Sequence, residues 1–281
     1  MDQEDNKEEN SNAFALIMNK PKKADSSDSN SNFLATSSDS WRVLAGTVLA
    51  RREHRISNGV PPKVAAFDLD GTLVRPKKGR VFPIDEHDWD WAFPEVPHKL
   101  KQLSKDGYDI VIFTNQKNMH VVDNRYKGLT VPQRLALITK KIDMLQKNLN
   151  IPLSAYVALA GDVFRKPARG MFDLMLDAYH ELHVKNPQTN NNADSDNPFA
   201  SDDLFAMPDS AEPSSSLNEL IDMKESFYVG DAAGRASCKG VHKDHSDADR
   251  AFAMNTGIRF STPETFFQNK PSPNDNTWEF K

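Results

Sequence analysis

The sequence is poor in cysteine and has no long hydrophobic run. Cys238 is the one cysteine among 281 residues, which excludes an intramolecular disulfide framework and fits a reducing compartment. No apolar run approaches the roughly 20 residues that cross a bilayer, and the first residues lack the pattern of a signal peptide. We therefore expect a soluble intracellular protein without a membrane partner.

The formal net charge of −5 is unevenly distributed along the chain. Residues 1–40 carry eight acidic and four basic side chains, and residues 187–222 carry eight acidic and no basic ones. Without these two segments the remainder carries +7. A basic surface around an active site favours a polyanionic substrate, although a generic solvated basic face fits the charge equally well.

Low-complexity composition divides the chain. Residues 1–40 are rich in Asp, Glu, Asn and Ser and are predicted to be disordered. Within them, residues 12–23 either form a short docking helix for a partner protein, followed by a weak nuclear-import patch, or are an unremarkable tail. Residues 41–270 are predicted to form one domain, interrupted by a disordered acidic insertion at residues 187–222. Residues 271–281 are predicted to be a loose tail.

One stretch organises the predicted domain. The apolar run from Val64 to Phe67 leads directly into Asp68-Leu-Asp70-Gly71-Thr. On a strand, Asp68 and Asp70 would project from the same face, and Gly71 would let the chain leave the sheet. Two carboxylates this close repel each other unless a cation lies between them, so the pair indicates a divalent cation and a phosphate. The alternative is a strand that ends in an ordinary acidic turn.

Three further apolar runs precede polar residues and alternate with predicted helices. The runs cover residues 108–113, 156–160 and 226–229, and the helices cover residues 98–105, 130–149, 171–183 and 251–255. This alternation predicts an α/β fold, a parallel sheet with helices on both faces, in which functional side chains gather at the carboxyl ends of the strands. The side chains that fall at such ends are Asp68, Asp70, Thr114, Lys166 and Asp231.

The order D-x-D-G-T, Thr-Asn, Lys and Gly-Asp resembles the motifs of the haloacid dehalogenase (HAD) phosphatase superfamily over roughly residues 60–260. The resemblance implies a HAD-like Rossmannoid fold with a minimal cap, because no long insertion follows the first motif or separates the second from the third. It implies that Asp68 is the nucleophile and forms an aspartyl-phosphate. Asp70 would protonate the leaving oxygen and then activate the hydrolytic water.

The same resemblance implies a phosphate site and a metal site. Thr114, Asn115 and Lys166 would hold the phosphoryl oxygens. Mg²⁺ would be held by the Asp68 side chain, the Asp70 carbonyl oxygen and the Asp231 carboxylate. Many HAD enzymes have a second acidic residue four positions after the Gly-Asp aspartate, where this chain has Arg235. A second carboxylate from Asp244, Asp247 or Asp249 therefore stays open.

The segments around residues 64–73, 113–116, 164–171, 228–235 and 243–255 are similar to the phosphatase domain of polynucleotide kinase 3′-phosphatases. This resemblance implies a Mg²⁺-dependent DNA 3′-phosphatase that acts on single-strand breaks and double-strand break ends during DNA repair in the nucleus, as a monomer. Arg165 and Arg235 match family positions that would meet the substrate or brace the site. No G-x-x-x-x-G-K-[ST] motif occurs, so we expect a stand-alone phosphatase without the kinase half.

Two other functions stay open from the sequence. One is a HAD phosphatase of a small phosphorylated metabolite, and the other is a catalytically silent HAD-fold module that binds DNA. The basic segments at residues 75–80 and 117–127 and the lack of a cap argue against the first. The complete motif set argues against the second.

Overall fold

The computed structural model describes residues 40–55, 60–77, 85–116, 130–185, 220–238, 242–271 and 273–274. The predicted docking segment at residues 12–23, half of the basic segment at residues 75–80, all of the basic segment at residues 117–127 and most of the acidic insertion lie outside these residues. Among the described helices, none has the length and apolar character needed to cross a membrane.

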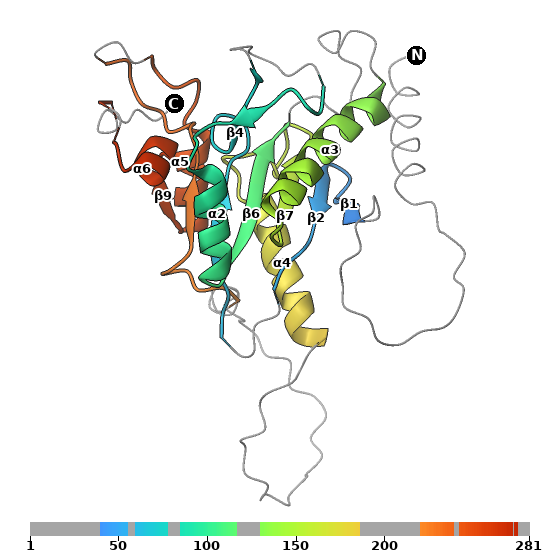
Figure 1. Cartoon of the computed structure of the whole chain (residues 1–281). Helices are drawn as coiled ribbons and strands as arrows, with labels where there is room; N and C mark the ends of the chain where they lie inside the picture. Colours follow the sequence, from blue (N-terminus) through green and yellow to red (C-terminus); the bar gives the residue numbers. More distant parts are fainter. Residues whose placement is uncertain are drawn as a thin grey trace, which may run out of the picture.

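A seven-stranded sheet forms the centre of the molecule, in the order β1-β2-β7-β6-β3-β8-β9 (Figure 1). The five strands from β7 to β9 are parallel, whereas β1 and β2 are antiparallel additions at one edge. The parallel sheet is thus confirmed, and β9 is a strand that the sequence analysis missed. The strands are β1 (Trp41–Leu44), β2 (Val48–Arg51), β3 (Lys63–Phe67), β6 (Tyr108–Asn115), β7 (Ser154–Ala158), β8 (Phe227–Val229) and β9 (Arg259–Ser261).

Helices cover both faces of the sheet, as predicted, because successive strand residues point to opposite sides. Ala65 and Phe67 belong to the core that includes residues of α2 (Val96–Lys105), α3 (Val131–Leu149) and α6 (Pro263–Gln268). Val64 and Ala66 belong to the core beneath α4 (Gly170–Lys185) and α5 (Ala248–Thr256). All four strand residues are fully buried.

Helix α3 begins and ends where its sequence supplies capping residues. At the start of α3, the Thr130 hydroxyl accepts a hydrogen bond from the Gln133 backbone and the Gln133 side chain accepts one from the Thr130 backbone. Such a capping box satisfies backbone donors that have no partner within the helix. At its other end, Asn150 adopts the left-handed conformation that commonly ends helices.

A two-stranded ribbon, β4 (Val74–Arg75) and β5 (Asp90–Trp91), lies between β3 and α2 in the chain. Trp89 and Trp91 pack edge to face, with ring centroids 5.3 Å apart, and contact the core on the α2 side of the sheet. The two rings therefore cover the core.

The acidic insertion ends earlier than predicted. Leu220, Ile221 and Asp222 belong to the segment that is predicted to be disordered, but Ile221 is buried in the core beneath α4 and α5. The Asp222 backbone N–H donates to the Pro62 carbonyl at 2.9 Å. The low-complexity composition continues up to Ile221, and composition alone does not show that this isoleucine is buried. Similarly, Asn274 in the predicted loose tail is fully buried and donates to the Ala236 carbonyl at 2.9 Å.

Candidate active site

The first motif leaves the sheet at the carboxyl end of β3, at the centre of the parallel strands. Asp68 follows the last strand residue, and its backbone N–H donates to the Val229 carbonyl of β8 at 2.9 Å. Gly71 adopts φ +88°, and a Cβ atom at this position would lie 2.6 Å from Asp231 Oδ2. The turn therefore packs its backbone directly on the Asp231 carboxylate, which requires glycine twice over, for the conformation and for the close approach.

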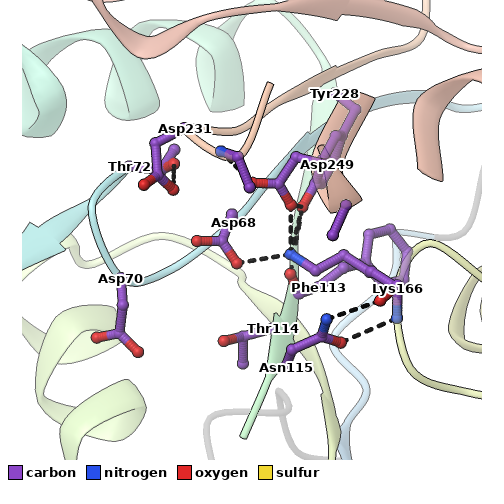
Figure 2. Close-up of polar contacts among 12 residues, drawn as sticks. Asp68, Asp70, Thr72, Phe113, Thr114, Asn115, Lys166, Tyr228, Asp231 and Asp249 are labelled. Carbon is purple, nitrogen blue, oxygen red and sulfur yellow. Dashed lines mark hydrogen bonds and ion pairs between the residues drawn. The ribbon is translucent and has the colours of Figure 1, made fainter. Parts of the chain in front are cut away.

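Lys166 lies at the centre of the site and is 3% exposed. Its ammonium group donates to Asp68 Oδ1 at 2.6 Å, to the Tyr228 hydroxyl at 2.7 Å and to Asp249 Oδ1 at 2.7 Å (Figure 2). An ammonium group has three donors, and these three acceptors use all of them. Burial alone would lower the pKa of Lys166, but Asp249 and Asp68 outweigh it and raise the pKa, so Lys166 is charged.

Asp249, one of the three residues that could supply a second carboxylate to the metal site, orients Lys166. It lies in the first turn of α5 and is 2% exposed. Its Oδ1 also accepts from the Tyr228 hydroxyl at 2.8 Å, and its Oδ2 accepts from the Ala232 backbone N–H at 2.9 Å. Both carboxylate oxygens thus have donors. Asp247, the residue at the N-cap of α5, makes no side-chain cap hydrogen bond.

The carboxylates crowd one another. Oxygen atoms of Asp68, Asp231 and Asp249 all lie within 4.8 Å of one another. Burial raises the pKa of Asp68 to about 7, with Asp249 and Asp70 adding to the rise and Lys166 opposing it. Burial, Asp68 and Asp249 together raise the pKa of Asp231 well above its ordinary value. When all three carboxylates are ionised, one ammonium group leaves two negative charges uncompensated.

This donor set fits a divalent cation with a preference for oxygen ligands. Hard cations such as Mg²⁺ bind carboxylate and carbonyl oxygens, and one such ion would balance the two uncompensated charges. Of the three carboxylates, Asp68 and Asp231 suit ligation best, because both oxygens of Asp249 already accept hydrogen bonds. Thr72 Oγ1 lies 3.4 Å from Asp231 Oδ1 and helps to hold that carboxylate. The predicted pair Asp68 and Asp231 is therefore brought together.

Asp70 is separate from this cluster. In Figure 2 its side chain lies on the side of Asp68 away from Lys166. Its Oδ1 accepts from Lys141 Nζ of α3 at 2.9 Å, and its Oδ2 accepts from Gln116 Nε2 at 2.8 Å. The side chain is 44% exposed, so the carboxylate remains open to a substrate at the mouth of the site.

Thr114 and Asn115 end β6 beside the cluster, where they were predicted. Thr114 is buried, and its Oγ1 accepts from Gln116 Nε2 at 3.1 Å. The Asn115 side chain donates to the Lys166 carbonyl at 3.0 Å and accepts from the Lys166 backbone N–H at 2.9 Å. Asn115 thus fixes the backbone that carries Lys166, and a direct contact with phosphate stays a prediction.

The two predicted arginines occupy different environments. Among the described residues, Nη1 of Arg165 is buried and has no hydrogen-bond partner, and a contact of Arg165 with the substrate stays a prediction. Arg235 is 6% exposed. Its Nε donates to Asp244 Oδ2 at 2.9 Å, its Nη1 to Glu264 Oε2 at 3.2 Å and its Nη2 to the Asp231 carbonyl at 3.3 Å. Of the two roles considered, meeting the substrate or bracing the site, these contacts favour bracing.

Three residues of the site were not found from the sequence: Tyr228, Gln116 and Lys141. The sequence predicts Tyr228 only as a residue of a buried strand. Gln116 directly follows β6 and Lys141 lies on α3, and sequence spacing connects neither residue with Asp70. The one available signal was Lys141 itself, a charged residue within the apolar stripe of a helix.

Comparison with known proteins places the chain in a family. The family model described as polynucleotide kinase 3 phosphatase matches residues 63–199 and 205–267. A bifunctional polynucleotide phosphatase/kinase of Schizosaccharomyces pombe is 36% identical over 205 residues, which are 73% of this chain and 37% of that protein. A polynucleotide 3′-phosphatase of Saccharomyces cerevisiae is 28% identical over 222 residues, 73% of this chain and 87% of that protein.

The chain therefore spans little more than a third of the length of the fission-yeast relative. Among solved structures, a D,D-heptose 1,7-bisphosphate phosphatase from B. bronchiseptica, complexed with magnesium and phosphate, aligns with a TM-score of 0.42 and 13% identity over 78% of this chain and 92% of that one. This likeness is too distant to carry an argument. The family model covers most of the described domain, including every predicted site residue, and the chain belongs to the polynucleotide kinase 3 phosphatase family.

Proposed function

We propose that this protein is a Mg²⁺-dependent polynucleotide 3′-phosphatase that removes the 3′-phosphate from DNA ends at strand breaks. The observation that carries the proposal is the contact between Asp68 and Lys166 at the carboxyl ends of the adjacent parallel strands β6, β3 and β8. A carboxylate paired with a buried ammonium group and flanked by a second carboxylate is the arrangement that phosphoryl transfer to Asp68 requires.

The reaction has two steps. In the first, an Asp68 oxygen attacks phosphorus, the bond from phosphorus to the 3′ oxygen breaks, and Asp70 gives that oxygen a proton. In the second, Asp70 takes a proton from water as the water attacks the aspartyl-phosphate, which releases phosphate and restores Asp68. Lys166 offsets the charge that gathers on the phosphoryl oxygens.

Asp68 and Asp231, with the Asp70 carbonyl oxygen, would hold Mg²⁺. When bound, the ion would supply positive charge to the phosphoryl group and to the crowded carboxylates. The raised pKa values of Asp68 and Asp231 support this assignment, because a nearby dication would favour the ionised forms of both groups.

A polynucleotide substrate is supported by the family and by charge. The yeast relative carries the name polynucleotide 3′-phosphatase, and this chain carries +7 outside its two acidic segments. A nuclear location, a monomeric state and docking of a repair protein through residues 12–23 remain predictions from the sequence.

Phosphate release from two matched oligonucleotides tests the proposal. One carries a 3′-phosphate and the other a 5′-phosphate, and each is incubated with Mg²⁺, with EDTA, and with the Asp68→Asn variant. We expect release only from the 3′ end and only when Mg²⁺ is present. The Asp68→Asn variant should release phosphate at least about 1,000-fold more slowly, because it lacks the nucleophile and the removal of other covalent nucleophiles costs roughly as much. Release from neither oligonucleotide, but from small phosphate esters, would refute the polynucleotide substrate.

A further inference from the structure

Lys141 is a buried lysine on the apolar face of α3. Its side chain is 7% exposed, and its helix neighbours Ile138 and Ile142 are core residues. Burying an ammonium group among apolar side chains costs free energy unless it is paired. Among the described residues its partner is Asp70, at 2.9 Å. The adjacent Lys140, by contrast, is 61% exposed and pairs with Glu86 at 3.2 Å.

Gln116 holds the other oxygen of the same carboxylate. Its Nε2 donates to Asp70 Oδ2 at 2.8 Å and lies 3.1 Å from Thr114 Oγ1. Asp70 is therefore fixed by two donors from two different elements, one on each oxygen. Rotation of the carboxylate about its last torsion would break at least one of these hydrogen bonds.

The pairing offsets the cost of burying Lys141 but adds little net stability beyond that. Lys141 is buried while its partner Asp70 is 44% exposed, so water partly screens the attraction, whereas the ammonium group bears the cost of desolvation. Replacing a buried charge by an apolar side chain of similar volume is often neutral or stabilising. Fold stability therefore does not explain a lysine at this position, whereas the orientation of Asp70 does.

We propose that Lys141 is a positioning residue, which holds the Asp70 carboxyl group in the orientation from which it transfers a proton to the leaving oxygen. The inference rests on the proposed function, because it assumes that Asp70 is the acid. As the bond from phosphorus to the 3′ oxygen breaks, its electron pair stays on oxygen and the Asp70 proton moves there. Lys141 keeps its own protons throughout and takes no part in the bond changes.

The test compares two leaving groups on one DNA sequence. The first substrate is a 3′-phosphorylated oligonucleotide, and the second has sulfur in place of the bridging 3′ oxygen. A thiolate leaves without protonation because its conjugate acid has a pKa of only about 8.5, so the second substrate bypasses the acid. We expect Lys141→Met to lower kcat/KM about 10- to 100-fold on the oxygen substrate and less than about threefold on the sulfur substrate.

Two further variants make the result decisive. Lys140→Met, the same change on the neighbouring exposed lysine, should leave both kcat/KM values unchanged. Gln116→Leu, which removes the other donor, should repeat the Lys141→Met pattern and carries the test if Lys141→Met does not fold, as judged by urea unfolding. Equal losses on both substrates in a folded variant, or no loss on either, would overturn the inference. A wild-type protein that releases phosphate from neither substrate would instead refute the proposed function.

Discussion

Replacement of Asp249 by asparagine tests whether this residue holds the site together. The change keeps the side-chain volume but removes the charge that faces Lys166 at 2.7 Å. It also exchanges one oxygen for an NH₂ group. Because Oδ1 accepts from Lys166 and Tyr228 while Oδ2 accepts from the Ala232 N–H, a donor will face a donor in either orientation of the amide.

The expected loss of stability is large for a conservative substitution. Removing one partner of a buried ion pair costs about 3–5 kcal/mol. The lower end applies because Lys166 keeps Asp68 and because the repulsion from Asp68 and Asp231 disappears. For a domain of this size, about 3 kcal/mol corresponds to a decrease in Tm of roughly 6–12 °C. Phosphatase activity should fall about 10- to 100-fold, as is typical when a group that orients a reacting residue is lost.

Thermal unfolding and phosphate release from a 3′-phosphorylated oligonucleotide measure both effects. Asp173→Asn is the matched control, since it makes the same chemical change in the first turn of α4, where the Asp173 side chain is 45% exposed and pairs with the 47% exposed Arg169. Its Tm should stay within about 2 °C of wild type, because an exposed ion pair between residues four apart at helical spacing contributes only about 0.3–0.5 kcal/mol. Equal Tm values for Asp249→Asn and wild type, with full activity, would refute the assignment of Asp249 as the residue that orients Lys166.

The residues that gather at the carboxyl ends of the strands were predictable, because the local sequence pattern shows where strands end and the parallel topology brings those ends together. The apolar runs ahead of Asp68 and Thr114 became the adjacent parallel strands β3 and β6. Once strands are parallel, their ends meet at one edge, so residues far apart in the sequence come together without any knowledge of side-chain contacts. This argument also placed Lys166 and Asp231 correctly beside Asp68.

Side-chain partners within the site were not predictable in the same way. Tyr228 is a residue of a buried strand, and nothing in its spacing shows that its hydroxyl, rather than an apolar edge, faces Lys166. The first turn of a helix suits an acidic residue through the helix dipole alone, so Asp249 could not be separated from Asp247. The short strand β9 was missed because Arg259–Ser261 alternates too briefly to be recognised.

Two further predictions concern the turn after β3 and the amino-terminal end of the sheet. Gly71 and Gly107 have φ values of +88° and +87°, so replacing either by alanine should cost about 1–2 kcal/mol of stability. The new Cβ would collide with Asp231 at position 71, whereas at position 107 it would meet nothing within 4 Å. Urea unfolding should show a loss of stability for both variants, whereas the rate of phosphate release should fall about tenfold or more only for Gly71→Ala. Equal activities of the two variants would contradict the packing of this turn on Asp231. His54 is held by the Tyr156 hydroxyl at 2.8 Å and Ser154 Oγ at 3.3 Å, and Asp109 lies 3.8 Å away. Burial, with Arg52 adding, lowers the pKa of His54 to about 3, so between pH 6.5 and 3 the unfolded chain binds a proton that the folded protein does not, and stability falls as the pH falls. Between pH 7.5 and pH 5, the free energy of unfolding should therefore fall by about 2 kcal/mol less in His54→Gln than in wild type. If urea unfolding gave the same pH dependence of stability for both proteins, His54 would not be buried in its neutral form.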